Sequence, residues 1–208
     1  MKKDLMHEVY LSLGSNLGDK ISNLSNAIVN LTESNILINH RNSNNQELIG
    51  MSSIYETKHW SEDPTEEDYP NYFNIACRAT TSFTPTDLLN EIKRIEKKIG
   101  RNLEKEQNTP REIDIDILFF DNKIINEKNL TIPHPRLSLR AFVLKPLSEI
   151  APDYVHPVEK ITVIELYKKL SFLEKKNVKK INKLIIKNLI KKLGIPFSIS
   201  NIFLHEAF

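Results

Sequence analysis

The sequence contains a single cysteine, Cys77. It lacks the apolar core of a secretory signal and any apolar run long enough to cross a membrane. One cysteine excludes an internal disulfide framework and fits a reducing compartment. It lies in an alternating apolar pattern, where a small buried side chain is expected more often than a reactive thiol. Residues 1–8 have no apolar core of a secretory signal, and no run reaches the roughly 18 apolar residues that cross a bilayer. We therefore expect a cytoplasmic protein with no membrane partner.

Charge is unevenly distributed along the chain, although the net charge is only +2. Residues 168–208 contain 10 lysines and two glutamates, whereas the preceding part has a slight acidic excess. At 208 residues, the chain has room for one domain with a sizeable core plus an appendage. We predict a catalytic domain over residues 1–170 and a Lys-rich amphipathic extension or linker over residues 171–208.

Apolar spacing predicts two amphipathic helices and several strands. Asp19 is the expected cap of the first helix, and Thr84 and Gly100 are the expected caps of the second. The side chains expected to face outward from the second helix are Lys93, Arg94 and Glu96. The expected strands cover residues 9–13, 51–57, 72–83, 111–121 and 141–146.

The order of the main elements is that of a ferredoxin-like β-α-β-β-α-β sandwich, an α+β fold. Both helices would lie on one face of an antiparallel sheet, which leaves the other face available for ligands. Asn74, Ala76 and Arg78 alternate onto that second face, where they could line a site. Loops are expected at residues 39–46 and in the acidic stretch 61–68, and a short hairpin at residues 123–130.

Asp114 and Asp116 lie two positions apart in a strongly apolar strand. Alternate side chains of a strand point to the same face, so the two carboxylates would project together about 7 Å apart. Two like charges on one buried face are unfavourable unless a positive group lies between them. Oxygen ligands with open coordination positions suit Mg²⁺ that also binds phosphates. Alternatively, one aspartate faces solvent on an edge strand and the other caps a turn.

Two arginines near this pair favour a phosphate site. Arg111 precedes Asp114 by three residues, and Arg101 lies a further ten residues upstream. A guanidinium is always charged and binds phosphate oxygens in a forked geometry. Arginines beside a metal-binding pair therefore fit a polyphosphate better than an ion pair alone, and we predict metal-dependent phosphate chemistry at this strand.

Six short segments, each weak alone, occur in one order along residues 9 to about 157. They are YLSLGSNLG (10–18), SSIYET (52–57), YFN (72–74), IEKKIGR (95–101), PREIDIDIL (110–118) and PHPR (133–136). Together they resemble the 6-hydroxymethyl-7,8-dihydropterin pyrophosphokinase family of folate biosynthesis. The resemblance implies transfer of the pyrophosphoryl group of ATP to the hydroxymethyl oxygen of the pterin, with release of AMP. It also implies the fold that the order of elements predicts.

By this resemblance, Asp114 and Asp116 hold two Mg²⁺ ions that bridge the triphosphate, and Arg101 and Arg111 stabilise the transferring group. Asp116 is also the nearest group that could accept the hydroxyl proton. ATP is the expected co-substrate. The positions that match nucleotide contacts are Glu96, Ile117, His134 and Arg140.

For the pterin, the resemblance implies aromatic stacking and hydrogen bonds at the edge of the ring. Tyr72 and Phe142 match the stacking residues, and Thr57 and Asn74 match the polar ones. A flat heterocycle with donors and acceptors around its rim requires this combination.

Two loops depart from the family pattern. Leu103 and residues 108–109 replace an arginine and an aromatic-glycine pair in the loop expected to close over ATP. Residues 57–60 replace a more familiar Thr-Pro start, and the acidic stretch follows them. We expect these changes to affect affinity and loop motion rather than the chemistry.

Residues 178–193 combine apolar side chains at helical spacing with lysines, which predicts a basic amphipathic helix. Such a helix can bind a membrane, nucleic acid or a protein, but more often its apolar side packs on its own domain. We expect the latter, with no nucleic-acid partner. The family also occurs fused ahead of dihydropteroate synthase, so residues 171–208 could instead be a linker. The chain could then associate with this next folate-pathway enzyme.

Two other classes of protein fit parts of the pattern. A polymerase-β-type nucleotidyltransferase also combines Gly-Ser with Asp-x-Asp, but its two motifs lie about a dozen residues apart. Here Gly14 and Asp114 are 100 positions apart. A non-catalytic ferredoxin-like binding module has no need for paired aspartates beside arginines. We therefore expect an enzyme with ATP and hydroxymethyldihydropterin as its small-molecule substrates.

Overall fold

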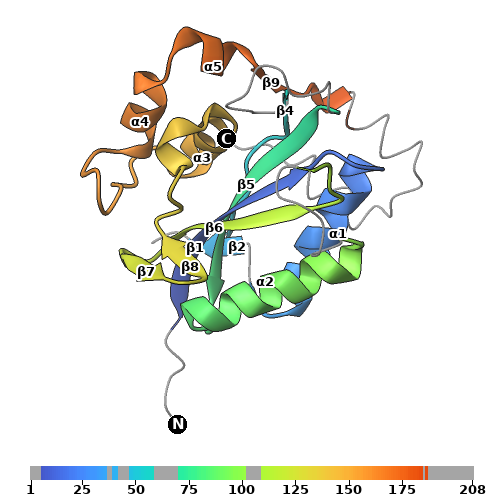
Figure 1. Ribbon diagram of the computed structural model, residues 1–208, viewed down its shortest axis with the longest axis vertical. Helices are drawn as coiled ribbons and strands as arrows, with labels where there is room; N and C mark the ends of the chain where they lie inside the picture. Colours follow the sequence, from blue (N-terminus) through green and yellow to red (C-terminus); the bar gives the residue numbers. More distant parts are fainter. Residues whose placement is uncertain are drawn as a thin grey trace.

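A five-stranded antiparallel sheet in the order β6-β1-β5-β4-β9 is the centre of the fold (Figure 1). The computed structural model describes residues 6–36, 39–41, 47–58, 70–101, 109–184 and 186. The predicted α+β class with an antiparallel sheet is confirmed. The strands are β1 (His7–Ser15), β4 (Tyr55–Thr57), β5 (Tyr72–Thr81), β6 (Asp114–Phe120) and β9 (Val178–Lys180).

Two small hairpins lie outside this sheet. β7 (Ile125–Glu127) pairs with β8 (Leu130–Ile132), which confirms the expected hairpin. β2 (Asn39–Arg41) pairs with β3 (Glu47–Ile49), so the start of the expected loop at 39–46 is a strand whose backbone groups bond to a partner. Residues 42–46 and the acidic stretch 61–68 lie outside the described residues.

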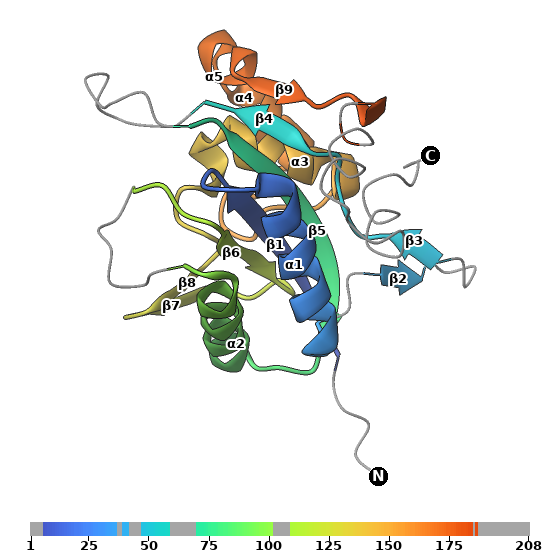
Figure 2. The same cartoon turned by 90° about the vertical axis from the view of Figure 1, so that its right-hand side faces the viewer.

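α1 (Lys20–Glu33) and α2 (Pro85–Ile99) cover one face of the sheet (Figure 2). The Asp19 carboxylate accepts hydrogen bonds from two amides of the first turn of α1, as predicted. Thr84 caps α2, and Gly100 ends it with a φ of 117°, a conformation that favours glycine. The apolar sides of both helices pack against alternate residues of β1, β5 and β6 to form the main core.

The opposite face is covered in part by α3 (Ala141–Ile150) and α4 (Val163–Lys169), so it is less open than predicted. The expected strand at 141–146 is wrong, because these residues begin α3. Ala141, Leu144 and Leu147 are buried at helical spacing, and Pro146 lies within the helix. The remaining short helices are η1 (Leu137–Leu139) and α5 (Phe172–Lys176).

A β-bulge marks where this second face changes character. The register of β1 and β6 shifts between Tyr10 and Leu11. As a result Leu118 and Phe119, although adjacent, both belong to the second core under α3, whereas Ile117 and Phe120 belong to the main core. Beyond the bulge, towards Asp114, the second face is polar.

The stretch predicted as a basic helix, residues 178–193, begins as a strand, whereas its residues 183, 184 and 186 are helical. β9 pairs antiparallel with β4 at the edge of the sheet, which overrides the helical spacing of its apolar residues. Ile181 and Ile186 are buried in the main core. Residues 187–208 lie outside the described part, and the predicted boundary at residue 170 stays a prediction. Within the described residues, no helix combines the length and apolar character needed to span a membrane.

Candidate active site

A cavity of about 290 Å³ opens on the polar part of the second face. Strands β1, β5 and β6 form its floor, and residues from the start of α3 and the segment before it form a wall. Ten of the predicted site residues line it, from five separate parts of the chain. They are Thr57, Tyr72, Asn74, Arg101, Arg111, Asp114, Asp116, His134, Arg140 and Phe142.

Two predicted nucleotide contacts do not line the cavity. Ile117 points to the main core, on the face of β6 opposite the two aspartates. Glu96 is fully buried, so the prediction that it faces outward is wrong. A buried carboxylate requires compensating partners, and Glu96 has three.

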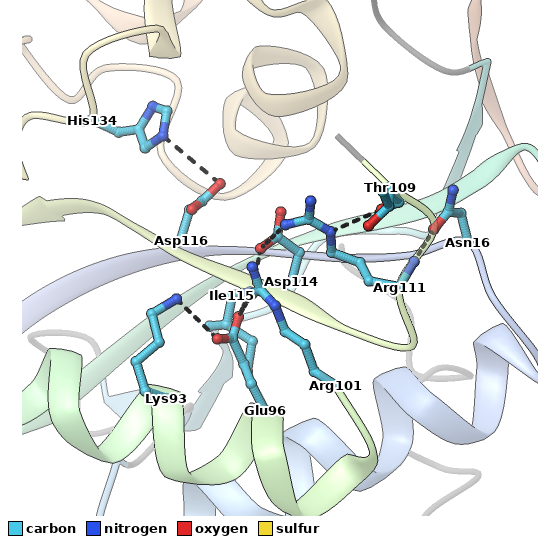
Figure 3. Close-up of polar contacts among 10 residues, drawn as sticks. All are labelled: Asn16, Lys93, Glu96, Arg101, Thr109, Arg111, Asp114, Ile115, Asp116 and His134. Carbon is cyan, nitrogen blue, oxygen red and sulfur yellow. Dashed lines mark hydrogen bonds and ion pairs between the residues drawn. The ribbon is translucent and has the colours of Figure 1, made fainter. Parts of the chain in front are cut away.

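The partners of Glu96 come from α2 and β6. Arg101 donates to it, Lys93 Nζ donates at 2.9 Å, and the Ile115 amide donates at 2.8 Å (Figure 3). These bonds join the end of α2 to β6. Glu96 therefore fixes the position of Arg101 relative to the strand that carries the aspartates.

Both predicted arginines contact Asp114. Arg101 Nη1 lies 2.7 Å from Asp114 Oδ1, and Arg111 Nη1 lies 3.3 Å from the same oxygen (Figure 3). The two guanidinium groups are largely buried. They concentrate positive charge beside one carboxylate, as a polyanionic ligand requires.

Asn16 holds the backbone of Arg111 in place, and sequence reasoning did not identify it. The Arg111 amide donates to Asn16 Oδ1 at 2.9 Å, and the Asn16 and Leu17 amides donate to the Arg111 carbonyl at 3.3 and 3.2 Å. Asn16 is 2% exposed. A buried amide side chain after strand β1 thus positions a predicted catalytic arginine 95 residues away.

Asp116 has less positive charge around it than Asp114. Burial and the nearby Asp114 charge raise its pKa to about 7, although Arg140 opposes the shift. His134 lies beside it, with Nε2 3.8 Å from Oδ2. Burial, with help from Arg140 and Arg136, lowers the pKa of His134 to about 4, so this imidazole is neutral at pH 7. The pair therefore leaves Asp116 incompletely compensated.

The other end of the cavity carries two aromatic rings and two neutral polar side chains. Asn74 Nδ2 donates to Thr57 Oγ1 at 2.7 Å, and both side chains are buried. The rings of Tyr72 and Phe142 line the same space. This combination of aromatic faces and fixed polar groups suits a flat heterocycle.

Five further residues line the cavity: Ser12, Gly14, Lys58, Lys93 and Arg136. Ser12 pairs with Asp116 and Gly14 with Asp114 across β1 and β6. A Cβ at Gly14 would lie 3.0 Å from Asn74 Oδ1, so glycine leaves space for that side chain. Val9, Leu11 and Leu13 are buried in the main core, and strand alternation places Ser12 on the opposite, cavity face.

The two aspartates fit a divalent cation. Within the described ranges, there is no group of three or more His, Cys, Asp or Glu side chains that could hold a metal ion. Mg²⁺, however, commonly takes one or two carboxylates and completes its octahedron with water and phosphate oxygens. The raised pKa of Asp116 indicates that a positive charge at this position would be favourable.

The fold and the cavity together define an α+β protein in which a cluster of arginines and aspartates lies next to an aromatic pocket. Comparisons with known proteins then identify the family. Residues 10–152 match the family described as 7,8-dihydro-6-hydroxymethylpterin-pyrophosphokinase (HPPK). The 2-amino-4-hydroxy-6-hydroxymethyldihydropteridine pyrophosphokinase of Aquifex aeolicus is 41% identical over 153 residues, which cover 74% of this chain and 86% of that protein.

Other relatives are longer. The folic acid synthesis protein fol1 of Pneumocystis carinii is 39% identical over 162 residues, 78% of this chain, but this chain spans only 20% of that protein. Among solved structures, wild-type HPPK-DHPS of Plasmodium falciparum with pterin and p-hydroxybenzoate has a TM-score of 0.62. It is 20% identical, and the match covers 87% of this chain and 47% of that one. That structure supports the fold.

The chain belongs to the HPPK family. The family predicted from the sequence is therefore confirmed, as is the predicted family activity, pyrophosphoryl transfer from ATP to hydroxymethyldihydropterin in folate synthesis.

Proposed function

We propose that this chain carries out pyrophosphoryl transfer in the cavity, with ATP at its charged end and the pterin at its aromatic end. The observation that carries this proposal is that ten of the twelve predicted site residues, taken from both sets, line one cavity. In the reaction, the hydroxymethyl oxygen attacks the β-phosphorus of ATP. The bond from that phosphorus to the α-phosphate oxygen breaks, AMP leaves, and the hydroxyl proton is lost.

Asp114 and Asp116 would hold Mg²⁺, and two ions are the number that the family resemblance implies. When bound, Mg²⁺ neutralises charge on the triphosphate as it accumulates. Arg101 and Arg111 donate to phosphate oxygens and stabilise the transferring group and the leaving AMP. Asp116 lines the cavity floor and would take the hydroxyl proton.

His134 and Arg140 would contact the nucleotide, because they line the cavity beside Asp116. Glu96 acts on the nucleotide through Arg101, which it binds directly. Ile117 would contact the nucleotide only through its backbone, since its side chain lies in the main core.

Tyr72 and Phe142 would stack on the pterin ring, and Thr57 and Asn74 would bind its polar edge. The Thr57–Asn74 hydrogen bond fixes the amide before the ligand arrives, so little ordering is needed on binding. Hydrogen-bond partners at fixed positions discriminate well against rings with a different donor and acceptor pattern.

Three broader proposals accompany this assignment. The strand order β6-β1-β5-β4 supports classifying the catalytic part as ferredoxin-like. The double name HPPK-DHPS of the Plasmodium falciparum protein supports association with the next folate-pathway enzyme. The cytoplasmic location rests on the single cysteine.

The test is to incubate the purified protein with ATP, Mg²⁺ and reduced hydroxymethylpterin and to separate the nucleotides. AMP should form only when the pterin is present, in equal amount to pterin diphosphate. Omission of Mg²⁺ with added EDTA should stop AMP formation. Release of ADP or of inorganic pyrophosphate as the main product would refute the assignment.

A further inference from the structure

Strand β4 contributes Thr57 to the aromatic end of the cavity, but it is too short to be held firmly by pairing with β5 alone. It is three residues long, and Thr57 is its last residue. On one side it pairs with β5, where Tyr55 lies opposite Asn74 and Thr57 opposite Tyr72. Without a second neighbour, β4 would be a short edge strand next to a ligand site.

That second neighbour is β9, from the basic tail (Figure 2). Thr57 lies opposite Val178, and Glu56 opposite Lys179. The Ile181 amide donates to the Ile54 carbonyl at 2.9 Å. Because hydrogen-bonded pairs alternate in an antiparallel ladder, the next bonded pair is Glu56 with Lys179.

Glu149 of α3 joins the two strands from a third side. Its carboxylate accepts hydrogen bonds from the Tyr55 hydroxyl at 2.6 Å, the Ser53 amide at 2.7 Å and Lys180 Nζ at 3.2 Å. Tyr55 is 1% exposed. One carboxylate therefore binds the start of β4 and the end of β9 together.

The tail after β9 is anchored by burial. Ile181 is 8% exposed and Ile186 is 3% exposed, and both pack in the main core. Burial of two such apolar side chains removes their surface from water, which stabilises the docked tail. The docked position of β9 is thus part of the fold and not a weak surface contact.

We propose that β9 is a positioning element for pterin binding: by pairing with β4 it holds Thr57 against Asn74 at the aromatic end of the cavity. This inference rests on the proposed function of that end, and it moves the working boundary of the catalytic domain beyond residue 170. The charged end is built on α2 and on β6, which lies at the opposite edge of the sheet from β9, and it should not respond to β9.

The test compares Lys179→Pro with Lys179→Ala in the full chain. Both variants lose the same exposed lysine, but only proline removes the amide that donates to Glu56. Calorimetry without ATP should give a Kd for the pterin about tenfold higher in the proline variant, the equivalent of one lost hydrogen bond. The alanine variant should stay near wild type, and the Kd for ATP with Mg²⁺ should be unchanged in both.

A second measurement does not depend on ligands. Hydrogen exchange of the Glu56 and Thr57 amides should be faster in the proline variant only. The proposal would be overturned if the two variants had equal pterin Kd values and equal exchange rates. It would also be overturned if the proline variant lost pterin and ATP binding in parallel and had a lower Tm. A wild-type protein that binds ATP but no pterin would instead refute the proposed function, and the exchange rates would then decide whether β9 holds β4.

Discussion

The sheet face that lies opposite α1 and α2 has two halves, both built on β1, β5 and β6: one half packs an apolar core and the other lines the cavity. Under α3, the face presents Tyr10, Ala76 and Phe119, all buried in an apolar core. Two residues after Tyr10 in β1 and two residues before Ala76 in β5, Ser12 and Asn74 line the cavity instead. The β-bulge in β6 lies between the two halves.

The difference shows how a charged site can be built on a buried sheet. In the apolar half, side chains of β1, β5 and β6 share a core with α3 and α4, so they are compensated by packing. In the cavity half, like charges on β6 stay close together and are only partly balanced, as the raised pKa of Asp116 indicates. Substitutions in the cavity half should therefore reduce activity and leave the fold intact, and substitutions in the apolar half should do the reverse.

The largest expected effect is on catalysis in the cavity half. Asp114→Asn and Asp116→Asn each remove a proposed metal ligand while keeping the side-chain volume. Each should lower kcat by about 10³-fold or more, because transition-state charge would lose its neutralisation. Single-turnover AMP formation measures the effect.

Asp153→Asn is a matched control, because Asp153 is exposed and does not line the cavity. Its rate should equal that of the wild type. Circular dichroism should show that all three variants are folded. A double variant of Asp114 and Asp116 that still releases AMP at the wild-type rate would refute the metal role.

The next largest effect is on stability in the apolar half. Phe119 is fully buried and its ring centroid lies 4.5 Å from that of Tyr154. Phe119→Ala should lower the free energy of unfolding by about 3–5 kcal/mol through lost burial and a cavity. Urea unfolding measures this loss.

Phe172→Ala is the control for this change, since Phe172 is 77% exposed and its truncation should cost less than about 0.5 kcal/mol. The folded fraction of Phe119→Ala should bind ATP normally. Equal stability losses at Phe119 and Phe172 would show that the apolar half is not the core that its burial indicates.

Local signals in the sequence correctly predicted several helix ends and the face on which the two aspartates lie. Asp19, Thr84 and Gly100 cap their helices as predicted, because capping depends on a few neighbouring residues. Strand alternation correctly put Asp114 and Asp116 on one face. The residues alone indicated a metal and phosphate site at this strand, and the family resemblance implied the role of each aspartate in pyrophosphoryl transfer.

The errors occurred where distant partners decide the outcome. Residues 141–146 form an apolar run that fits a buried strand or a buried helix equally well, and only packing on the sheet selects α3. The tail has helical spacing, yet β4 offers an open edge that pairs with β9. Glu96 looked exposed because its three donors, among them the Ile115 amide, cannot be identified before folding.

The smallest expected effect is a gain in stability in the cavity half. The pKa of Asp116 is raised to about 7 in the folded protein, above the usual value near 4 in the unfolded chain. The folded state therefore binds more protons than the unfolded state between these values. The contribution of the protonated Asp116 carboxyl to stability is fully present below about pH 4 and is lost as the pH rises to about 7.

Asp116→Asn should remove this loss of stability. In EDTA, the free energy of unfolding of the variant should therefore be higher than that of the wild type above pH 7 and equal to it near pH 4. The Asp116 side chain is 36% exposed, so solvent screening limits the gain to on the order of 1 kcal/mol. Added Mg²⁺ should stabilise the wild type more than the variant, because the cation compensates the carboxylate that asparagine lacks. Urea unfolding at several pH values measures both effects. If the free energies of unfolding of the wild type and the variant differ by the same amount at every pH from 4 to 8, Asp116 carries no uncompensated charge.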